Sequence, residues 1–303
     1  MSGSALILGG NGRFGRNCTL AFKAAGWQVR QFDRQSDDLM QAVQGVDVIV
    51  AAWNPAYPDW ATQVLQQHTQ VIEAAKTVDA TVIVPGNVYV YGPENEKVWR
   101  NTTPHLAQNP LGRIRIDMEA VYRNSDVRTI LLRAGDFIDT QDSGNWFDMI
   151  LTSKLSKGVF RYPGRVDIPH AWAFLPDLTR AAVALADRRD SLNRFEDVAF
   201  PGYTMSGQDM AHALSDVCGV DLRLKQVNWL PFRLMSPVWK MASCLLEMRY
   251  LWNTPHSLAR DRFVELLPDF QETPVTVALR RAVAGKVQKS GLSITDTSTQ
   301  TSR

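Results

Sequence analysis

Short apolar runs alternate with longer segments of helical periodicity from the start of the chain to about residue 135. Short apolar runs are typical of strands buried on both faces, and their alternation with helices predicts βα units and a parallel sheet. We therefore expect an α/β fold. The predicted strands are residues 6–8, 29–32, 46–52, 81–84 and 128–132, and the predicted helices are residues 15–25, 59–77 and 113–124.

The interval between Asp33 and Val46 is too short for a further strand with its turns. It leaves room for one short helix over residues 37–44. Most doubly wound domains add a third strand at this point, so we expect this edge of the sheet to be shortened.

The pattern is less regular after Gly135. Residues 160–165 contain Tyr, Pro and Gly and predict turns, and an alanine-rich helix is expected from residue 176 to 187. These elements are too few for a large independent fold, so we expect them to cover the carboxyl edge of the sheet. Further predicted elements are helices over residues 207–217 and 234–252 and a strand near residues 222–226.

A glycine cluster follows the first apolar run directly. Gly10, Gly12 and Gly15 fit the spacing GxGxxG, and the looser spacing GxxGxxG begins at Gly9. A strand that enters a tight turn and then a helix leaves N–H groups unpaired at the positive end of the helix dipole, where a pyrophosphate binds. Asp33 ends the next apolar run, where an acid can accept hydrogen bonds from the adenosine ribose. The sequence predicts a Rossmann-like doubly wound parallel sheet that binds a dinucleotide.

This reading divides the chain into two parts and a tail. Residues 1–137 are predicted to form the Rossmann dinucleotide-binding domain, and residues 138–286 a small carboxyl-terminal substrate-binding subdomain. Elements at about residues 166–187 are expected to return to the Rossmann core. Residues 287–303 are rich in Ser, Thr and Gln and lack aromatic residues, which predicts a disordered tail.

Charges near the ribose position favour different cofactors. Asp33 would repel a 2′-phosphate and favours NAD, whereas Arg34 and Arg13 have guanidinium groups that can bind this phosphate and favour NADP. The predicted cofactor is NAD(P), with NAD slightly favoured over NADP.

The composition is that of an ordinary globular protein, with 303 residues, 45% hydrophobic and 21% charged. A net charge of +2 is too small to indicate binding to nucleic acid or to an anionic membrane, so the expected partner is a small-molecule substrate. Cys18, Cys218 and Cys244 are widely spaced and form no CxxC pair. This argues against disulfides and a metal site and for a cytoplasmic protein.

We also expect neither a signal peptide nor a membrane span, since no apolar run reaches the roughly 18 residues that a span needs. The nearest candidate, residues 234–252, is interrupted by Lys240, Glu247 and Arg249. Its Met and aromatic residues, among them Trp239, are expected to form one face of a buried helix.

Several segments occur in a characteristic order along the chain: the glycine cluster, Asp33, residues 45–52, Val90-Tyr91-Gly92, residues 131–137 and residues 174–177. In this order and spacing they resemble the extended short-chain dehydrogenase/reductase superfamily, in its NAD-dependent epimerase/dehydratase branch. The resemblance covers about residues 5–285. It implies an active site between a Rossmann domain and a substrate domain, and a homodimer paired through the helices at 59–77 and 113–124.

The catalytic positions depart from the pattern of that family, which has a Ser or Thr before Val-Tyr-Gly and later a Tyr-x-x-x-Lys. Asn87 stands at the first of these positions, Leu111 at that of the Tyr and Arg115 at that of the Lys. Glu119 is placed as in the family. Leu has no proton to transfer, and Arg can bind the nicotinamide ribose but stays charged. The candidate catalytic residues are therefore Asn87, Arg115 and, as a replacement acid, Tyr89.

Further candidates lie around the expected cleft. Arg133 ends a central strand and would contact an anionic substrate group or pair with Asp136, and Arg165 and His170 belong to a loop that is expected to overhang the cleft. Trp53 and Asn54 are expected to line the nicotinamide side. The predicted substrate contacts are Asn54, Arg133, Arg165 and His170, and the predicted cofactor contacts are Gly9, Gly10, Asn11, Gly12, Arg13, Phe14, Gly15, Asp33, Arg34, Ala51, Ala52, Trp53 and Arg115.

Two functions fit these features. The first is an NAD(P)-dependent oxidoreductase or epimerase/dehydratase-like enzyme that acts on a small carbonyl or hydroxyl substrate and takes its proton from water or a replacement acid. The second is a non-catalytic NAD(P)-binding sensor or regulatory protein. The related nitrogen-metabolite-repression regulators show that the superfamily implies this alternative.

Overall fold

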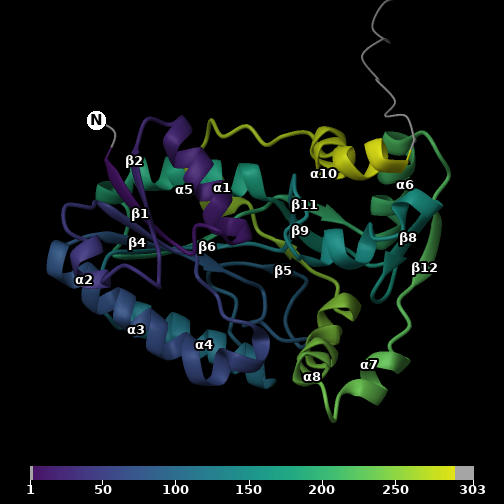
Figure 1. Ribbon diagram of the computed structural model, residues 1–303, viewed down its shortest axis with the longest axis horizontal. Helices are drawn as coiled ribbons and strands as arrows, with labels where there is room; N and C mark the ends of the chain where they lie inside the picture. The colour runs from purple at the N-terminus through teal and green to yellow at the C-terminus, as the bar shows by residue number, and fades with distance from the viewer. Residues whose placement is uncertain (1–2, 291–303) are drawn as a thin grey trace, which may run out of the picture.

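A six-stranded sheet forms the centre of the protein in the computed structural model, which describes residues 3–290 (Figure 1). The strands are β1 (Ser4–Leu8), β2 (Gln28–Phe32), β3 (Val48–Ala51), β4 (Thr81–Gly86), β6 (Thr129–Arg133) and β10 (Phe195–Ala199). Their order is β10-β6-β4-β3-β1-β2, and every neighbouring pair is parallel. This order confirms the predicted Rossmann-like doubly wound α/β fold.

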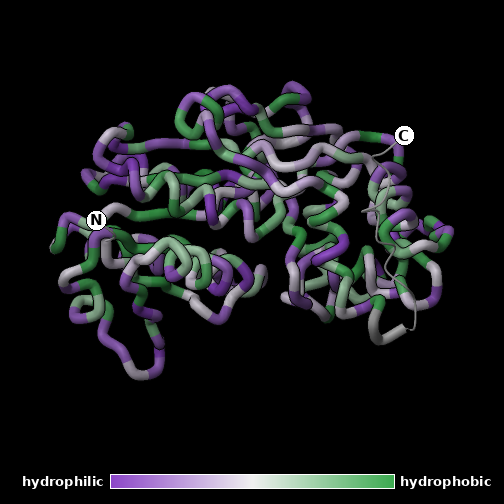
Figure 2. The backbone as a smooth tube through the Cα atoms, turned by 90° about the horizontal axis from the view of Figure 1, so that it is seen from above, coloured by the Kyte–Doolittle hydropathy of each residue, from purple (hydrophilic) through white to green (hydrophobic). Residues whose placement is uncertain are grey.

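The central strands are buried on both faces. Ala5 and Ile7 of β1 belong to the core on one face of the sheet, and Leu6 and Leu8 belong to the core on the other. Successive side chains of a strand point to opposite faces, so a strand that is covered on both faces needs apolar residues at every position. In Figure 2, β1 accordingly appears as a green, hydrophobic segment.

Two long helices cover each face of the sheet (Figure 1). On one face α1 (Arg13–Ala24) packs against α5 (Leu175–Asp187), and on the other α3 (Trp60–Val78) packs against α4 (Pro110–Arg123). Only the short helix α2 (Leu39–Ala42) lies between β2 and β3 along the chain, and β2 forms the edge of the sheet. The predicted shortening of this edge is confirmed.

Smaller sheets and helices form the other half of the molecule (Figure 1). A core that includes Phe160, Tyr162 and Trp172 holds much of this half together. Its strands are β7 (Asp136–Ile138), β9 (His170–Phe174) and β11 (Tyr203–Met205) in one sheet, β8 (Val159–Tyr162) with β12 (Arg223–Gln226), and β5 (Val98–Trp99) with β13 (Ser257–Leu258). Its helices are α6 (Gly207–Cys218), α7 (Leu230–Met235), α8 (Lys240–Glu247) and α10 (Val275–Ser290). Helix α9 (Asp261–Leu266) packs instead against β10 of the central sheet. Short helical turns are η1 (Tyr57–Asp59), η2 (Phe147–Leu151), η3 (Leu155–Lys157), η4 (Arg189–Ser191) and η5 (Met248–Asn253).

The prediction of turns at residues 160–165 is wrong for residues 160–162. Val159–Tyr162 forms β8 and pairs in parallel with β12. Val159, Phe160 and Tyr162 are buried there, whereas Arg161 is exposed. The sequence Pro163-Gly164 breaks the strand only after this apolar stretch, so the turn signal lies three residues later than predicted.

The single helix predicted over residues 234–252 is also wrong. This segment forms the end of α7, then α8 and η5, because Pro237 has no N–H group with which to continue a helix. Trp239 is 45% exposed, so the predicted buried face is interrupted as well. None of the helices within residues 3–290 has both the length and the apolar character needed to cross a bilayer.

Strand β10 was not among the predicted elements, although it pairs with β6 in the central sheet. It lies within the segment predicted as the substrate-binding subdomain, and the boundary at residue 137 stays a prediction. Helix α10 reaches Ser290, so the predicted tail is helical at its first residues. The rest of that tail lies outside the described residues.

The guanidinium of Arg133 joins three elements at the carboxyl end of β6. Its side chain is fully buried and binds Glu119 of α4 through two hydrogen bonds of 3.0 and 2.8 Å. Nη2 also donates to Asp197 of β10 at 2.7 Å, and Nη1 donates to the carbonyl oxygen of Asn87 at 2.7 Å. Burial alone would lower the pKa of Arg133, but the two carboxylates raise it well above its usual value.

This position corrects the prediction that Arg133 contacts the substrate or pairs with Asp136. Its guanidinium has no exposed surface, and its partners are Glu119 and Asp197. A buried charge is costly unless opposite charges compensate it, and the two carboxylates that do so hold the side chain away from solvent.

We expect Arg133→Met to lower the free energy of unfolding by about 3–5 kcal/mol, because it leaves two buried carboxylates without their partner. Urea denaturation followed by circular dichroism measures this change. Arg165→Met is the matched control, since Arg165 pairs with Asp167 in solvent and both side chains are more than half exposed. Equal stability of the two variants would contradict the structural role of Arg133.

Candidate functional site

The glycine cluster forms a tight turn between β1 and α1. Gly9 has a φ of +78°, and its carbonyl oxygen accepts a hydrogen bond of 2.9 Å from the N–H of Gly12. A Cβ atom on Gly15 would lie 2.2 Å from the same carbonyl oxygen, so the first turn of α1 approaches the end of β1 more closely than any side chain allows. The first N–H groups of α1 therefore face the space beyond the sheet.

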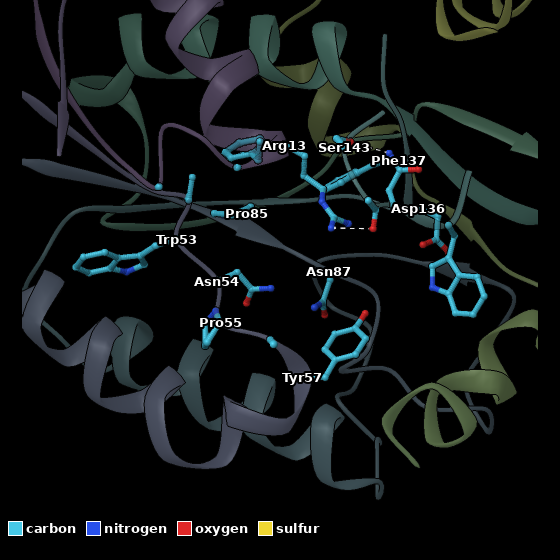
Figure 3. Close-up of a pocket in the computed structure, with 18 of the residues that line it drawn as sticks. Arg13, Trp53, Asn54, Pro55, Tyr57, Pro85, Asn87, Asp136, Phe137 and Ser143 are labelled. Carbon is cyan, nitrogen blue, oxygen red and sulfur yellow. Dashed lines mark hydrogen bonds between the residues drawn. The ribbon is translucent and has the colours of Figure 1, made fainter. Parts of the chain in front are cut away.

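A pocket of about 1080 Å³ opens at this turn (Figure 3). It runs along the loops that follow the carboxyl ends of β1, β3 and β4, the edge at which open α/β sheets bind ligands. In Figure 3, Trp53 lies at one end, Asp136 lies at the other, and Asn87 and Tyr57 lie between them. The predicted site residues that line the pocket are Gly9, Asn11, Gly12, Arg13, Phe14, Arg34, Ala51, Ala52, Trp53, Asn54, Asn87, Tyr89 and Arg115.

Two residues define the end of the pocket near β2. The guanidinium carbon of Arg34 lies 4.9 Å from the centre of the Trp53 ring, and both residues line the pocket. Asp33 does not line it in this conformation, because its carboxylate accepts a hydrogen bond of 2.9 Å from the N–H of Gln35. Arg34 is therefore the nearer charged group to the pocket.

The loop after β7 closes over the first turn of α1. Arg13 Nη2 donates to the carbonyl oxygen of Gly144 at 3.0 Å, and Arg16 Nη2 binds the carboxylate of Asp139 at 2.6 Å. Asp148 holds the loop in shape by accepting hydrogen bonds from the N–H groups of Ser143 and Gly144. These contacts place a wall of the pocket opposite the glycine turn.

Asn87 and two tyrosines form the middle of the pocket. Asn87 Oδ1 accepts a hydrogen bond of 3.0 Å from the N–H of Tyr89, which leaves the amide nitrogen of Asn87 as the free donor. The hydroxyl groups of Tyr57 and Tyr89 are 2.5 Å apart. Burial raises the pKa of both tyrosines above its ordinary value, so both are protonated at neutral pH.

Tyr57 was not among the predicted site residues. It lies in the loop that follows β3, at the carboxyl edge of the sheet, and its position after a buried parallel strand is the signal that could have identified it.

Leu111 and Arg115 are the residues that the sequence resemblance aligns with the family Tyr and Lys. Leu111 is buried, and its N–H donates to the carboxylate of Glu247 at 2.7 Å. Arg115 lines the pocket and donates to the carbonyl oxygen of Pro85 at 2.7 Å. Burial lowers the pKa of Arg115, yet a guanidinium stays charged at neutral pH.

A carboxylate and an imidazole form the far end of the pocket. Asp136 lines the pocket and shares a hydrogen bond of 2.7 Å with His170 Nε2. His170 is itself buried, with its ring stacked on Trp252 at 4.4 Å between ring centres. The prediction that His170 contacts the substrate directly is therefore wrong. His170 lies behind Asp136 and orients this carboxylate.

The substrate contact predicted for Arg165 is also wrong. Its side chain is 58% exposed, pairs with Asp167, and does not line the pocket. Gly10 and Gly15 lie in the glycine turn but behind the pocket surface.

One group of three potential metal ligands occurs among the described residues: His105, Glu119 and Asp197. Arg133 Nη2 lies 2.8 Å from Glu119 and 2.7 Å from Asp197. The guanidinium thus occupies the place of a cation, and the cluster is an ion-pair network.

No protein-family model and no curated protein matches this chain. Solved structures share its fold. MoeE5 in complex with UDP-glucose and NAD aligns with a TM-score of 0.73 at 13% identity, over 95% of this chain and 99% of that chain. A putative epimerase from Burkholderia cenocepacia J2315 aligns with a TM-score of 0.71 at 16% identity, over 95% and 99% of the two chains.

UDP-glucuronic acid 4-epimerase from Bacillus cereus in complex with NAD aligns with a TM-score of 0.70 at 15% identity, over 95% of this chain and 99% of that chain. The fold of this chain is therefore the one seen in these three structures. It confirms the fold that the sequence resemblance implied.

We expect Gly15→Ala to lower the free energy of unfolding by about 1–3 kcal/mol, because the new Cβ overlaps the carbonyl oxygen of Gly9. Gly285→Ala is the matched control. Nothing lies within 4 Å of a Cβ atom placed on Gly285 in α10. Gly285→Ala should therefore raise the free energy of unfolding by about 0.5–1 kcal/mol, because glycine is unfavourable within a helix. Both values come from urea denaturation, and a neutral Gly15→Ala would contradict the close approach.

Proposed function

We propose that the pocket binds a nicotinamide dinucleotide with its pyrophosphate on the glycine turn. The observation that carries this proposal is the pocket that opens at the glycine turn, where Gly9 and Gly12 line it beside the start of α1. Gly15 has no side chain, which lets the first turn of α1 approach the end of β1 closely. β1 lies between β3 and β2, at the point where the strand order reverses and doubly wound sheets bind dinucleotides.

Two buried nitrogen atoms support the fit of such a ligand. Trp53 Nε1 and Arg115 Nε have no hydrogen-bond partner among residues 3–290, although both side chains line the pocket. A buried donor without a partner is costly, and a bound polar ligand would relieve that cost. Arg115 would hold the nicotinamide ribose, and Arg34 with Trp53 would hold the adenosine half.

The choice between the two cofactors depends on Asp33 and Arg34. The carboxylate of Asp33 favours NAD, but Arg34 is the residue on the pocket wall. We infer that both nucleotides bind, and that Arg34 supplies the contact to the 2′-phosphate of NADP.

The function that the geometry supports best is that of an NAD(P)-dependent oxidoreductase or epimerase/dehydratase-like enzyme acting on a small carbonyl or hydroxyl substrate. The bound cofactor supplies hydride transfer at its nicotinamide ring. The amide nitrogen of Asn87 would donate a hydrogen bond to the substrate oxygen, and the hydroxyl of Tyr57 would supply the proton. The hydroxyl of Tyr89 shares a hydrogen bond with that of Tyr57, and it would donate to Tyr57 after the proton is lost.

The nucleotide sugars named for the structural neighbours, such as UDP-glucose, are the first substrates to try. A second function is favoured by Leu111, which removes the usual proton donor. On that reading the protein is a sensor that binds NAD(P) and reports its presence without turnover.

Titration with NADH and NADPH, followed by nicotinamide fluorescence, tests the binding proposal. Arg34→Ala should lower the affinity for NADPH by about 10-fold or more, because it removes a charge-assisted pair with the 2′-phosphate. It should leave the affinity for NADH unchanged. Arg165→Ala is the control and should change neither affinity. Absence of binding by the unmodified protein would refute the proposal, and an equal loss for both nucleotides would refute the role of Arg34.

Tyr57→Phe tests the proton donor. With a substrate that turns over, we expect kcat to fall by about 100-fold or more at unchanged NADH affinity, since the phenyl ring keeps the packing and loses the proton. Tyr250→Phe is the control, because the hydroxyl of Tyr250 contacts only the carbonyl oxygen of Tyr89 at 3.4 Å among the bonds of the described residues. Full turnover by Tyr57→Phe would exclude this acid, and binding without turnover across aldehydes, ketones and nucleotide sugars would favour the sensor.

A further inference from the structure

The segment that contains α7 and the start of α8 exposes an unusual concentration of apolar side chains. Leu234 is 71% exposed and Val238 is 81% exposed. Leu234 belongs to α7 and Val238 to the connection between α7 and α8, which reaches the lowest point of the molecule in Figure 1. The exposed large hydrophobic residues of this segment are Leu230, Leu234, Met235, Val238 and Trp239.

This segment is firmly attached to the rest of the protein. Trp229 is buried, and its Nε1 donates to the carbonyl oxygen of Pro163 at 2.7 Å. The rings of Phe232 and Trp239 stack with centres 6.3 Å apart, and Ser243 Oγ donates to the carbonyl oxygen of Ser236 at 3.0 Å. The exposed apolar residues thus belong to an ordered surface.

The charged residues within this segment of the chain all have one sign. From residue 222 to residue 246 the chain contains no Asp or Glu, whereas Arg223, Lys225, Arg233 and Lys240 are all exposed. The whole chain has a net charge of only +2, so the basic character is local to this segment.

We propose that the surface formed by residues 229–241 docks on an anionic lipid bilayer. Apolar side chains and a tryptophan would enter the interfacial region, and the basic side chains beside them would contact the phosphate headgroups. A second copy of the chain is a poorer occupant, because a symmetric contact would bring the same basic residues together.

The position of the pocket gives a second reason to propose a lipid bilayer. Phe232, Trp239, Met241 and Leu245 form part of the pocket wall, so the same segment faces both the outside and the candidate site. Docking would bring this apolar wall next to the bilayer, from which a substrate with an apolar portion can enter.

Sedimentation with lipid vesicles tests the proposal. The protein should bind vesicles of equal parts phosphatidylglycerol and phosphatidylcholine, bind phosphatidylcholine vesicles more weakly, and lose binding as ionic strength rises. The double variant Leu234→Ser/Val238→Ser should bind the mixed vesicles roughly 10-fold or more weakly, because it removes two apolar side chains from the contact. The variant Arg233→Glu/Lys240→Glu should lose the preference for the anionic lipid.

The control is Leu20→Ser/Leu65→Ser, which removes two exposed leucines from helices α1 and α3 and should leave vesicle binding unchanged. Thermal unfolding of each variant verifies that it is folded. Failure of the unmodified protein to bind the mixed vesicles, or equal losses in the two double serine variants, would overturn the proposal. A dimer that Leu234→Ser/Val238→Ser converts to a monomer, without vesicle binding, would assign the surface to a second copy instead. None of these outcomes depends on the nucleotide proposal.

Discussion

The buried guanidinium of Arg133 is the interaction on which the arrangement of the pocket depends. It lies at the carboxyl end of a central strand, between the carboxylates of Glu119 and Asp197. A charge in this position is stable only when its partners are present, so α4, β6 and β10 must meet there in one register. Because the carbonyl oxygen of Asn87 is a further partner, the same interaction fixes the loop whose side chains form the middle of the pocket.

On the proposed function, the pocket joins a glycine turn for the nucleotide to a reacting site that differs from the family pattern. The turn depends on backbone groups and on missing side chains at Gly9 and Gly15, and it is complete. The reacting site depends on individual side chains, and Leu111 and Arg115 cannot move a proton there. Tyr57 and Asp136 bring titratable groups to the same pocket, from the start of η1 and the start of β7. The loop after β3 contributes to both halves, since Trp53 and Tyr57 both line the pocket.

Some elements could be predicted from the sequence because their physical cause is local. The apolar runs of β1 and β3 reflect burial on both faces, and α3 and α4 show the helical period. Strand β10 was not predicted because Glu196 and Asp197 interrupt its apolar pattern. Both acids are nonetheless buried, since Arg262 pairs with Glu196 and Arg133 pairs with Asp197. These arginines come from distant parts of the chain, so no local pattern could show that the acids are neutralised.

The sequence by itself determined the parallel sheet and the glycine turn, because periodicity and glycine spacing are properties of short segments. Only the tertiary structure decided that Arg133 is internal, that His170 lies behind Asp136, and that Tyr57 lies beside Asn87. The physical reason is that the role of a polar side chain is set by its partners and its burial. Both depend on which distant segments the fold brings to the same edge of the sheet.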